Sequence, residues 1–139
     1  MTEPERAARE YLRFEGEETI LATLRCADRV AEGWDDDSTT DRNAVVEPLL
    51  RELRETGLMT RFPDLLSEAV AAAGFSLQAR PVPAPPYVAV TSRGPVLRAT
   101  LPVGRLVVSF RLFDVIRAEE TRYVRGSNDL RSAISVELK

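Results

Sequence analysis

The spacing of apolar residues changes near residue 80 and divides the chain into two parts. Over the first 75 residues, apolar side chains recur every three or four positions, which is the period of an amphipathic helix. This pattern predicts one long or two shorter helices between Thr2 and Ala31, a helix that runs to about Thr56, and another between Thr60 and Gly74. After residue 86 the period changes to two, which is typical of half-buried strands.

Local signals set the predicted ends of these helices. Thr2 and Glu5 have the spacing of a capping box, in which each side chain bonds to the other residue's backbone N–H. Gly16 lies inside the first apolar stripe, and the sequence does not decide whether it breaks the helix. Residues 33–41 combine glycine, acidic and hydroxyl residues, which predicts a loop. Pro48 predicts a kink in the second helix or a later start for it.

Four stretches in the second part alternate apolar and polar residues, and each predicts a strand: 87–92, 95–101, 105–117 and 132–139. Two-residue hairpin loops at Arg93–Gly94 and Val103–Gly104 would place Leu97 opposite Phe110 and leave one face of the sheet entirely apolar. Residues 119–129 fit either a loop or a short strand.

Together these elements predict an α+β domain of two layers. Residues 1–79 form a helical layer, and three to four helices pack on one face of an antiparallel meander of three to five strands at 87–139. The segment 80–86, "RPVPAPP", contains four prolines in seven residues and is predicted to be a stiff connector. The residues beyond it would make a thin core alone, so we expect a single domain over 1–139.

Composition narrows the chemistry that the chain can perform. It contains no histidine, and Lys139 is the only lysine, so 18 of the 19 basic residues are arginine. The usual general base, the common nitrogen ligand of metals and the Schiff-base amine are therefore missing or nearly so. The acidic run Asp35–Asp37 lacks the alternating ligand spacing of an EF-hand and is predicted to be a solvated loop. We expect a protein that is not an enzyme, with no catalytic residue, no cofactor and no metal site.

Signals for membrane insertion and secretion are also missing from the chain. No apolar run reaches the roughly 18 residues of a membrane span, and residues 1–10 are charged rather than apolar. Cys26 is the only cysteine, so an internal disulfide is excluded, which fits a reducing compartment. These features predict a cytoplasmic protein with no membrane partner.

Charge is divided unevenly between the two parts of the chain. Residues 1–79 carry nine arginines and 17 acidic residues, a balance of −8, whereas residues 80–139 carry nine arginines, Lys139 and five acidic residues, a balance of +5. Either the two parts attract each other on folding, or the basic part meets an anionic partner.

The basic part places several arginines on the second face of the predicted sheet. This face also carries Val96, Val107 and Val115, so it is too apolar for a simple solvated surface and too polar for a dry core. Arg117 lies six residues after Arg111, which is an even number, and so it is predicted to lie on the same face. We take the face as the candidate binding surface, with these residues: Tyr87, Arg93, Arg98, Arg105, Arg111 and Phe113.

Two functions are compatible with such a face. The first is a non-enzymatic protein-interaction module that forms a homo-oligomer, in the simplest case a homodimer, through it. The alternative is binding of nucleic acid or another anion, because arginine forks match phosphates and carboxylates and Tyr87 or Phe113 could stack on a base. A third interpretation gives the arginines no external partner: they keep the sheet soluble or pair with the acidic helices.

Three features resemble small uncharacterised proteins of halophilic archaea. They are the near replacement of lysine by arginine, the "WDDD" loop at 34–37, and "PPYVAVTSRGPVLRATL" with "GRLVVSFRLFDV" between Pro85 and Val115. The resemblance implies a cytoplasmic protein of unknown function and transfers no catalytic residue. The net charge of −3 departs from the strongly acidic halophile pattern, which leaves a bacterium of high GC content as the alternative source.

Overall fold

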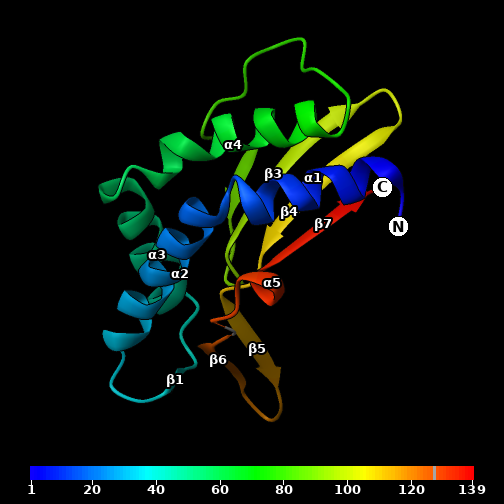
Figure 1. Cartoon of the computed structure of the whole chain (residues 1–139). Coiled ribbons are helices and arrows are strands. Elements are labelled where there is room, and N and C mark those ends of the chain that lie inside the picture. Colours follow the sequence, from blue (N-terminus) through cyan, green and yellow to red (C-terminus); the bar gives the residue numbers. More distant parts are fainter. Residues whose placement is uncertain (127) are drawn as a thin grey trace.

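The computed structural model describes residues 1–126 and 128–139, and it consists of an N-terminal helical part followed by a mainly β part (Figure 1). The helices are α1 (Glu3–Phe14), α2 (Glu17–Glu32), α3 (Asn43–Glu55), α4 (Leu58–Ala72) and the single turn α5 (Leu130–Ala133). The strands are β1 (Ser38–Thr39), β2 (Val88–Val90), β3 (Pro95–Leu101), β4 (Gly104–Phe110), β5 (Phe113–Arg117), β6 (Thr121–Arg125) and β7 (Ile134–Leu138).

The start of α1 confirms the predicted capping box. The Thr2 hydroxyl oxygen accepts a hydrogen bond from the Glu5 backbone N–H, and the Glu5 carboxylate accepts one from the Thr2 N–H at 2.8 Å. Because α1 ends at Phe14 and α2 begins at Glu17, the first apolar stripe is broken into two helices at Gly16.

Both later helices contain a proline and begin before it. Pro48 lies inside α3, which already begins at Asn43, so the predicted later start is wrong. The next helix, α4, begins at Leu58 and therefore two residues before Thr60. Gly57 separates the two helices with a φ of 80°, a left-handed conformation that glycine adopts without strain.

All strands pair antiparallel, in two sheets. One sheet has the order β2-β3-β4-β7, and the other has the order β1-β6-β5. The predicted fold class is confirmed: the domain is α+β, with N-terminal helices and a C-terminal antiparallel meander. Of the stretch that the sequence left open, 121–125 forms β6, and residue 127 lies outside the described residues.

The hairpin loops lie one residue earlier than the sequence predicted. They are Ser92–Arg93 and Pro102–Val103, so Leu97 pairs with Val108 rather than with Phe110. This shifts the pairing by two residues. A shift by an even number leaves every side chain on its predicted face, so the apolar inner face was predicted correctly although the register was not.

The glycines after these loops explain why the loops lie one residue earlier than predicted. Gly94 and Gly104 have φ values of 145° and 144° and stand where the returning strands begin. A Cβ at Gly94 would lie 2.6 Å from the Phe110 carbonyl oxygen, which is closer than a real contact allows. Both the positive φ of Gly94 and the neighbouring backbone therefore require glycine there.

The stretch 105–117, predicted as one strand, forms two strands in different sheets. β4 ends at Phe110 and pairs with β3 and β7, whereas β5 begins at Phe113 and pairs with β6. Arg111 is exposed, and Leu112 and Phe113 are then both fully buried. The change of pairing partners after Phe110 marks the place where the chain leaves the first sheet.

Helices α1 and α4 cover one face of the four-stranded sheet (Figure 1). Phe62 of α4 meets Phe110 of β4 with ring centroids 5.4 Å apart. Side chains from the inner sheet face complete this core, among them Leu97, Ala99, Leu106, Val108 and Val136. No described helix covers the opposite face, which places it at the surface of the molecule.

The small sheet lies at the other end of the molecule, next to α2 (Figure 1). Trp34 packs on Phe113 with ring centroids 5.8 Å apart. Arg125 of β6 donates from Nε to Asp28 of α2 at 2.8 Å and from Nη1 to the Leu112 carbonyl at 2.6 Å. These contacts fix the small sheet to the helical layer and to the point where β4 leads into β5.

Candidate functional site

The face of the four-stranded sheet opposite the helices, which we call the outer face, carries most of the predicted site. The register aligns Arg98 of β3 with Val107 of β4 and Glu137 of β7, and Thr100 with Arg105. Its other members on the strands are small: Ala89, Val96, Ser109 and Ser135.

A groove at one end of the outer face brings together three residues of the predicted site. Tyr87, Arg98 and Arg105 line it, with a volume of about 630 Å³. The chain that follows α4, residues 76–79, forms the opposite wall and adds the polar side chains of Ser76 and Gln78. This volume lies within the range of about 300–1,000 Å³ that is usual for ligand sites.

The backbone of Thr100 adds hydrogen-bonding groups to this groove. Arg105 exchanges both of its backbone hydrogen bonds with Lys139, at 3.0 and 2.9 Å. In an antiparallel ladder, a residue bonded in this way to one neighbouring strand directs no backbone group to the other. Thr100 pairs with Arg105, so the N–H and C=O of Thr100 also point away from β4. They point toward the edge where β2 would continue, but β2 begins only at Val88 and does not extend opposite Thr100.

A second hollow at the other end of the outer face holds two more residues of the predicted site. Arg93, in the β2–β3 loop, and Arg111, just after β4, line a cavity of about 300 Å³. Ser109, Ser135 and Glu137 also line it, so this hollow contains one carboxylate. Glu137 pairs with Lys139 at 3.6 Å. The two hollows share no lining residue.

The arginines of the two hollows are exposed and are not used to hold the fold. Within residues 1–126 and 128–139, no side-chain hydrogen bond or ion pair is formed by Arg93, Arg98, Arg105 or Arg111. In contrast, Arg61 binds Glu68 within α4, Arg29 binds Glu52 between α2 and α3, and Arg125 binds Asp28. The predicted pairing of the sheet arginines with the acidic helices is therefore not seen at these four positions.

A family model matches residues 6–139, nearly the whole chain. The chain belongs to the family of the domain of unknown function DUF7988. No curated protein and no solved structure matches the chain. The outer face of this DUF7988 domain must therefore be interpreted from its own residues.

One member of the predicted site does not belong to the outer face. Phe113 of this DUF7988 domain begins β5, is fully buried and packs on Trp34, so its predicted place on the outer face is wrong. Val115 and Arg117 follow it in β5 and are likewise absent from the outer face. Val107 does lie there, but only 8% of it is exposed. The face is thus less apolar than the sequence predicted.

The polar cluster between α1 and α4 is fully paired and stabilises the fold. The Tyr11 hydroxyl donates to Glu68 at 2.6 Å, and Arg61 donates to both Glu68 carboxylate oxygens at 2.9 and 3.1 Å. The bond to Glu68 raises the pKa of Tyr11 to about 12, and the bonds from Arg61 lower the pKa of Glu68. These hydrogen bonds among Tyr11, Arg61 and Glu68 form a structural contact between α1 and α4.

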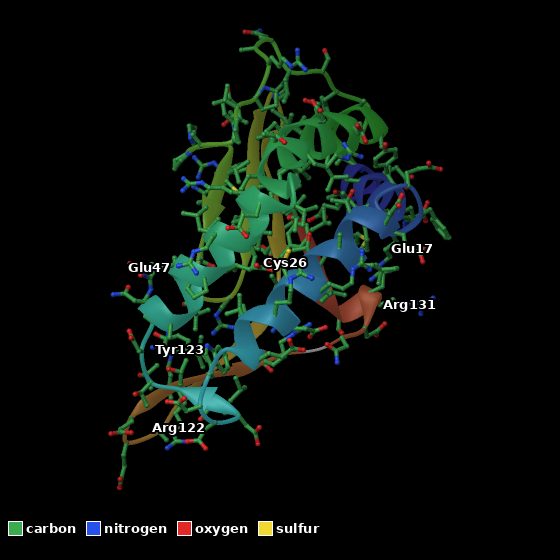
Figure 2. The ribbon with its side chains drawn as sticks, turned by 90° about the vertical axis from the view of Figure 1, so that its left-hand side faces the viewer. Glu17, Cys26, Glu47, Arg122, Tyr123 and Arg131 are labelled. Carbon is green, nitrogen blue, oxygen red and sulfur yellow. The ribbon has the colours of Figure 1, made fainter. Side chains whose placement is uncertain are left out.

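The acidic loop and the cysteine provide no second site. Asp35 and Asp36 line a hollow beside Arg122, which lies at the lower end of the view in Figure 2. The Arg122 Nη1 donates a hydrogen bond to the Ser38 hydroxyl at 3.1 Å. In the part of the chain that the structure describes, no group of three or more acidic or cysteine side chains could hold a metal ion. Cys26 is buried among the helices (Figure 2), and burial raises the pKa of its thiol.

None of the described helices is long and apolar enough to cross a membrane.

Sequence reasoning missed the wall of the groove and the role of Arg125. The wall comes from residues 76–79, which follow a helix and show no periodicity, so only the fold brings them to the sheet. Arg125 was treated as part of an undecided stretch. The two adjacent apolar residues at Leu112–Phe113 do not separate the two sheets by themselves, because Leu106, Val107 and Val108 are also adjacent and buried within β4.

Proposed function

We propose that this protein is a non-enzymatic binding protein whose outer face takes an anionic partner. The observation that carries the proposal is the group of four exposed arginines, in two hollows of one face, without acidic partners among the described residues. Arginine presents a planar fork of donors that matches phosphate and carboxylate groups, and such charge-assisted bonds are the stronger ones. Glu137 is the one carboxylate on the strands of this face, and it is paired with Lys139.

The distribution of charge favours this partner over a second copy of the chain. In a twofold dimer the same patch faces itself, so the four arginines would approach four others. The apolar side chains that would offset this repulsion are few, because Phe113 is buried elsewhere and Val107 is nearly covered. Self-association through the outer face remains the competing proposal, and the same experiment separates the two.

The charge of the helical layer favours binding of an anion at the outer face. It holds the balance of −8, whereas the sheet part holds +5. An anion is therefore repelled from the helices and attracted to the outer face, which focuses binding there despite the net charge of −3.

Sedimentation velocity over a salt series, with and without a short mixed-sequence single-stranded DNA, tests the proposal. We expect a monomer that co-sediments with the DNA and binds it progressively more weakly as the salt concentration rises. The double variant Arg98→Gln, Arg105→Gln should weaken binding about tenfold or more and lower the salt slope by about 1.5. Glu137→Gln should act in the opposite direction and strengthen binding.

The matched control is the double variant Arg25→Gln, Arg42→Gln, which removes the same charge from exposed positions of the helical part. It should leave binding close to that of the wild type. If it weakens binding as much as the outer-face variant, or if the wild type is a dimer indifferent to DNA, the outer face is not an anion-binding surface.

We also propose the cytoplasm of a halophilic archaeon as the setting. The single, buried cysteine supports a reducing compartment, and the use of arginine in place of lysine supports the source. High salt screens exposed point charges, so recognition through arginine's hydrogen-bonding fork keeps more of its strength there than attraction to lysine would.

A further inference from the structure

We infer that the anionic partner is a single-stranded nucleic acid that crosses the outer face and reaches both hollows. This inference rests on the proposed function and names the partner. It follows from the spacing of the two hollows, from the aromatic ring in the larger one and from the exposed polar groups beside it.

The spacing of the arginines favours a linear polyanion over a single anion. Arg98 lies level with Val107 on β4, and Arg111 follows four residues later. At about 3.3 Å per residue, the two levels are about 13 Å apart. Because the hollows share no lining residue, one phosphate seated in either leaves the other two arginines unoccupied. A strand with a phosphate at every nucleotide occupies both.

The larger groove also provides a ring on which a base can stack. Arg98 donates its backbone N–H to the Tyr87 carbonyl at 2.8 Å, which makes Tyr87 the cross-strand neighbour of Arg98 on the outer face. Tyr87 is half-buried, packs in part against the hydrophobic core, and lines the groove together with both arginines. A base on Tyr87 thus has its phosphates within reach of Arg98 and Arg105, the combination that single-strand binding proteins use.

Polar groups beside the ring suit the edge of an unpaired base. Gln78 and Ser76 offer both donors and acceptors from the opposite wall. The Thr100 backbone N–H and C=O point to the same groove. A duplex keeps the faces of its bases stacked inside, so it would use the arginines and leave Tyr87 without a base to stack on.

Fluorescence anisotropy with labelled oligonucleotides tests the inference at low salt. The probes are oligo-dT and oligo-U of 2, 4, 6, 8 and 12 nucleotides and a 12-base-pair duplex. We expect affinity to rise with length and to level off once the strand reaches both hollows, and the duplex to bind more weakly than the 12-nucleotide strands. DNA and RNA strands share this chemistry, and the two series show which is preferred.

Variants separate stacking from charge. Tyr87→Leu should weaken binding of the 12-nucleotide strand about 5- to 150-fold without changing the salt slope, and Tyr87→Phe should retain most of the affinity. The double variant Arg93→Gln, Arg111→Gln should reduce the affinity of the 12-nucleotide strand and leave that of the dinucleotide unchanged. Thermal melts of each variant show whether the fold is retained.

Several results would overturn the inference and leave the proposed function intact. They are affinity that does not increase beyond the dinucleotide, a duplex or a polyglutamate peptide that binds as tightly as the single strand, or a Tyr87→Leu variant that binds like the wild type. In each of these cases, loss of binding in Arg98→Gln, Arg105→Gln still supports an anion site. If that double variant binds as tightly as the wild type, both the inference and the proposed function are wrong.

Discussion

The indole nitrogen of Trp34 donates a hydrogen bond to the backbone carbonyl of Ala44 at 2.9 Å. In a regular helix this carbonyl accepts from the N–H four residues later, but that residue is Pro48, which has no N–H. Trp34 therefore supplies the donor that the proline lacks. The α2–α3 loop thus satisfies a helical carbonyl that would otherwise be left without its partner.

This arrangement predicts a coupling between Trp34 and Pro48. Trp34→Phe keeps a ring against Phe113 but leaves the Ala44 carbonyl unpaired, and it should lower the free energy of unfolding by about 1–3 kcal/mol. In a Pro48→Ala background the new N–H bonds to Ala44 itself, so the same change should cost clearly less. Urea unfolding of the four proteins measures the coupling. Equal costs in the two backgrounds would contradict it.

Glu5 predicts a specific loss of stability in acid. Its carboxylate accepts from the backbone N–H of Thr2 at 2.8 Å and of Leu138 at 2.7 Å, and these bonds lower its pKa from about 4.5 to about 2. The folded pKa lies below the unfolded one, so the contribution of Glu5 is present above about pH 4.5. It is lost as the pH falls toward about 2.

Unfolding midpoints measured between pH 6 and pH 2 test the role of Glu5. Glu5→Gln should flatten the decline between about pH 4.5 and 2 relative to the wild type. Glu10→Gln removes the same charge from an exposed position of α1 and should retain the wild-type slope. An identical slope in the wild type and Glu5→Gln would show that the Leu138 contact does not depend on ionised Glu5.

The features predicted correctly from the sequence are those that local pattern determines. The capping box of Thr2 and Glu5 needs only a spacing of three, and the inner sheet face needs only alternation, which a two-residue shift in register preserves. The break after Phe110 was missed because alternation was extended through Arg111 into a segment with the opposite phase. The groove beside Tyr87 was missed because its wall comes from residues far away in the sequence.

Arg125 is expected to be the arginine on which the fold depends most. Its side chain is 15% exposed, and it donates to Asp28, to the Leu112 carbonyl and to Asn128. Arg125→Ala should lower the free energy of unfolding by about 1.5–3 kcal/mol, because it removes the charge-assisted hydrogen bonds to Asp28 and to the Leu112 carbonyl together. Arg125→Lys should recover only part of this loss, since an ammonium cannot reproduce the fork.

The control for Arg125 lies on the same hairpin. Arg117 is exposed, and Arg117→Ala should change the free energy of unfolding by no more than about 0.5 kcal/mol. Guanidinium unfolding of Arg125→Ala, Arg125→Lys, Arg117→Ala and the wild type measures these changes in the free energy of unfolding. A cost for Arg117→Ala as large as that for Arg125→Ala would assign the effect to hairpin charge rather than to the Arg125 contacts.

Cys26 is expected to be unreactive in the folded protein. It has no exposed surface, and burial raises the pKa of its thiol more than the nearby Thr56 and Arg29 lower it. Labelling with a thiol-specific disulfide reagent at pH 8 should be slow in buffer and fast in urea, because the thiolate is the reacting form. Labelling in buffer at the rate seen in urea would mean that α2 opens readily from the helical layer.

The uneven charge of residues 1–79 and 80–139 also gives the molecule a permanent electric dipole. A protein with this dipole behaves differently on its two sides: an anion-exchange resin attracts the helical side, whereas a cation exchanger attracts the outer face. At one pH and low ionic strength, both resins should retain the same preparation, although the net charge predicts retention by only one. Immobilisation on either resin would also orient the molecules, leaving the outer face free on the anion exchanger and covered on the cation exchanger.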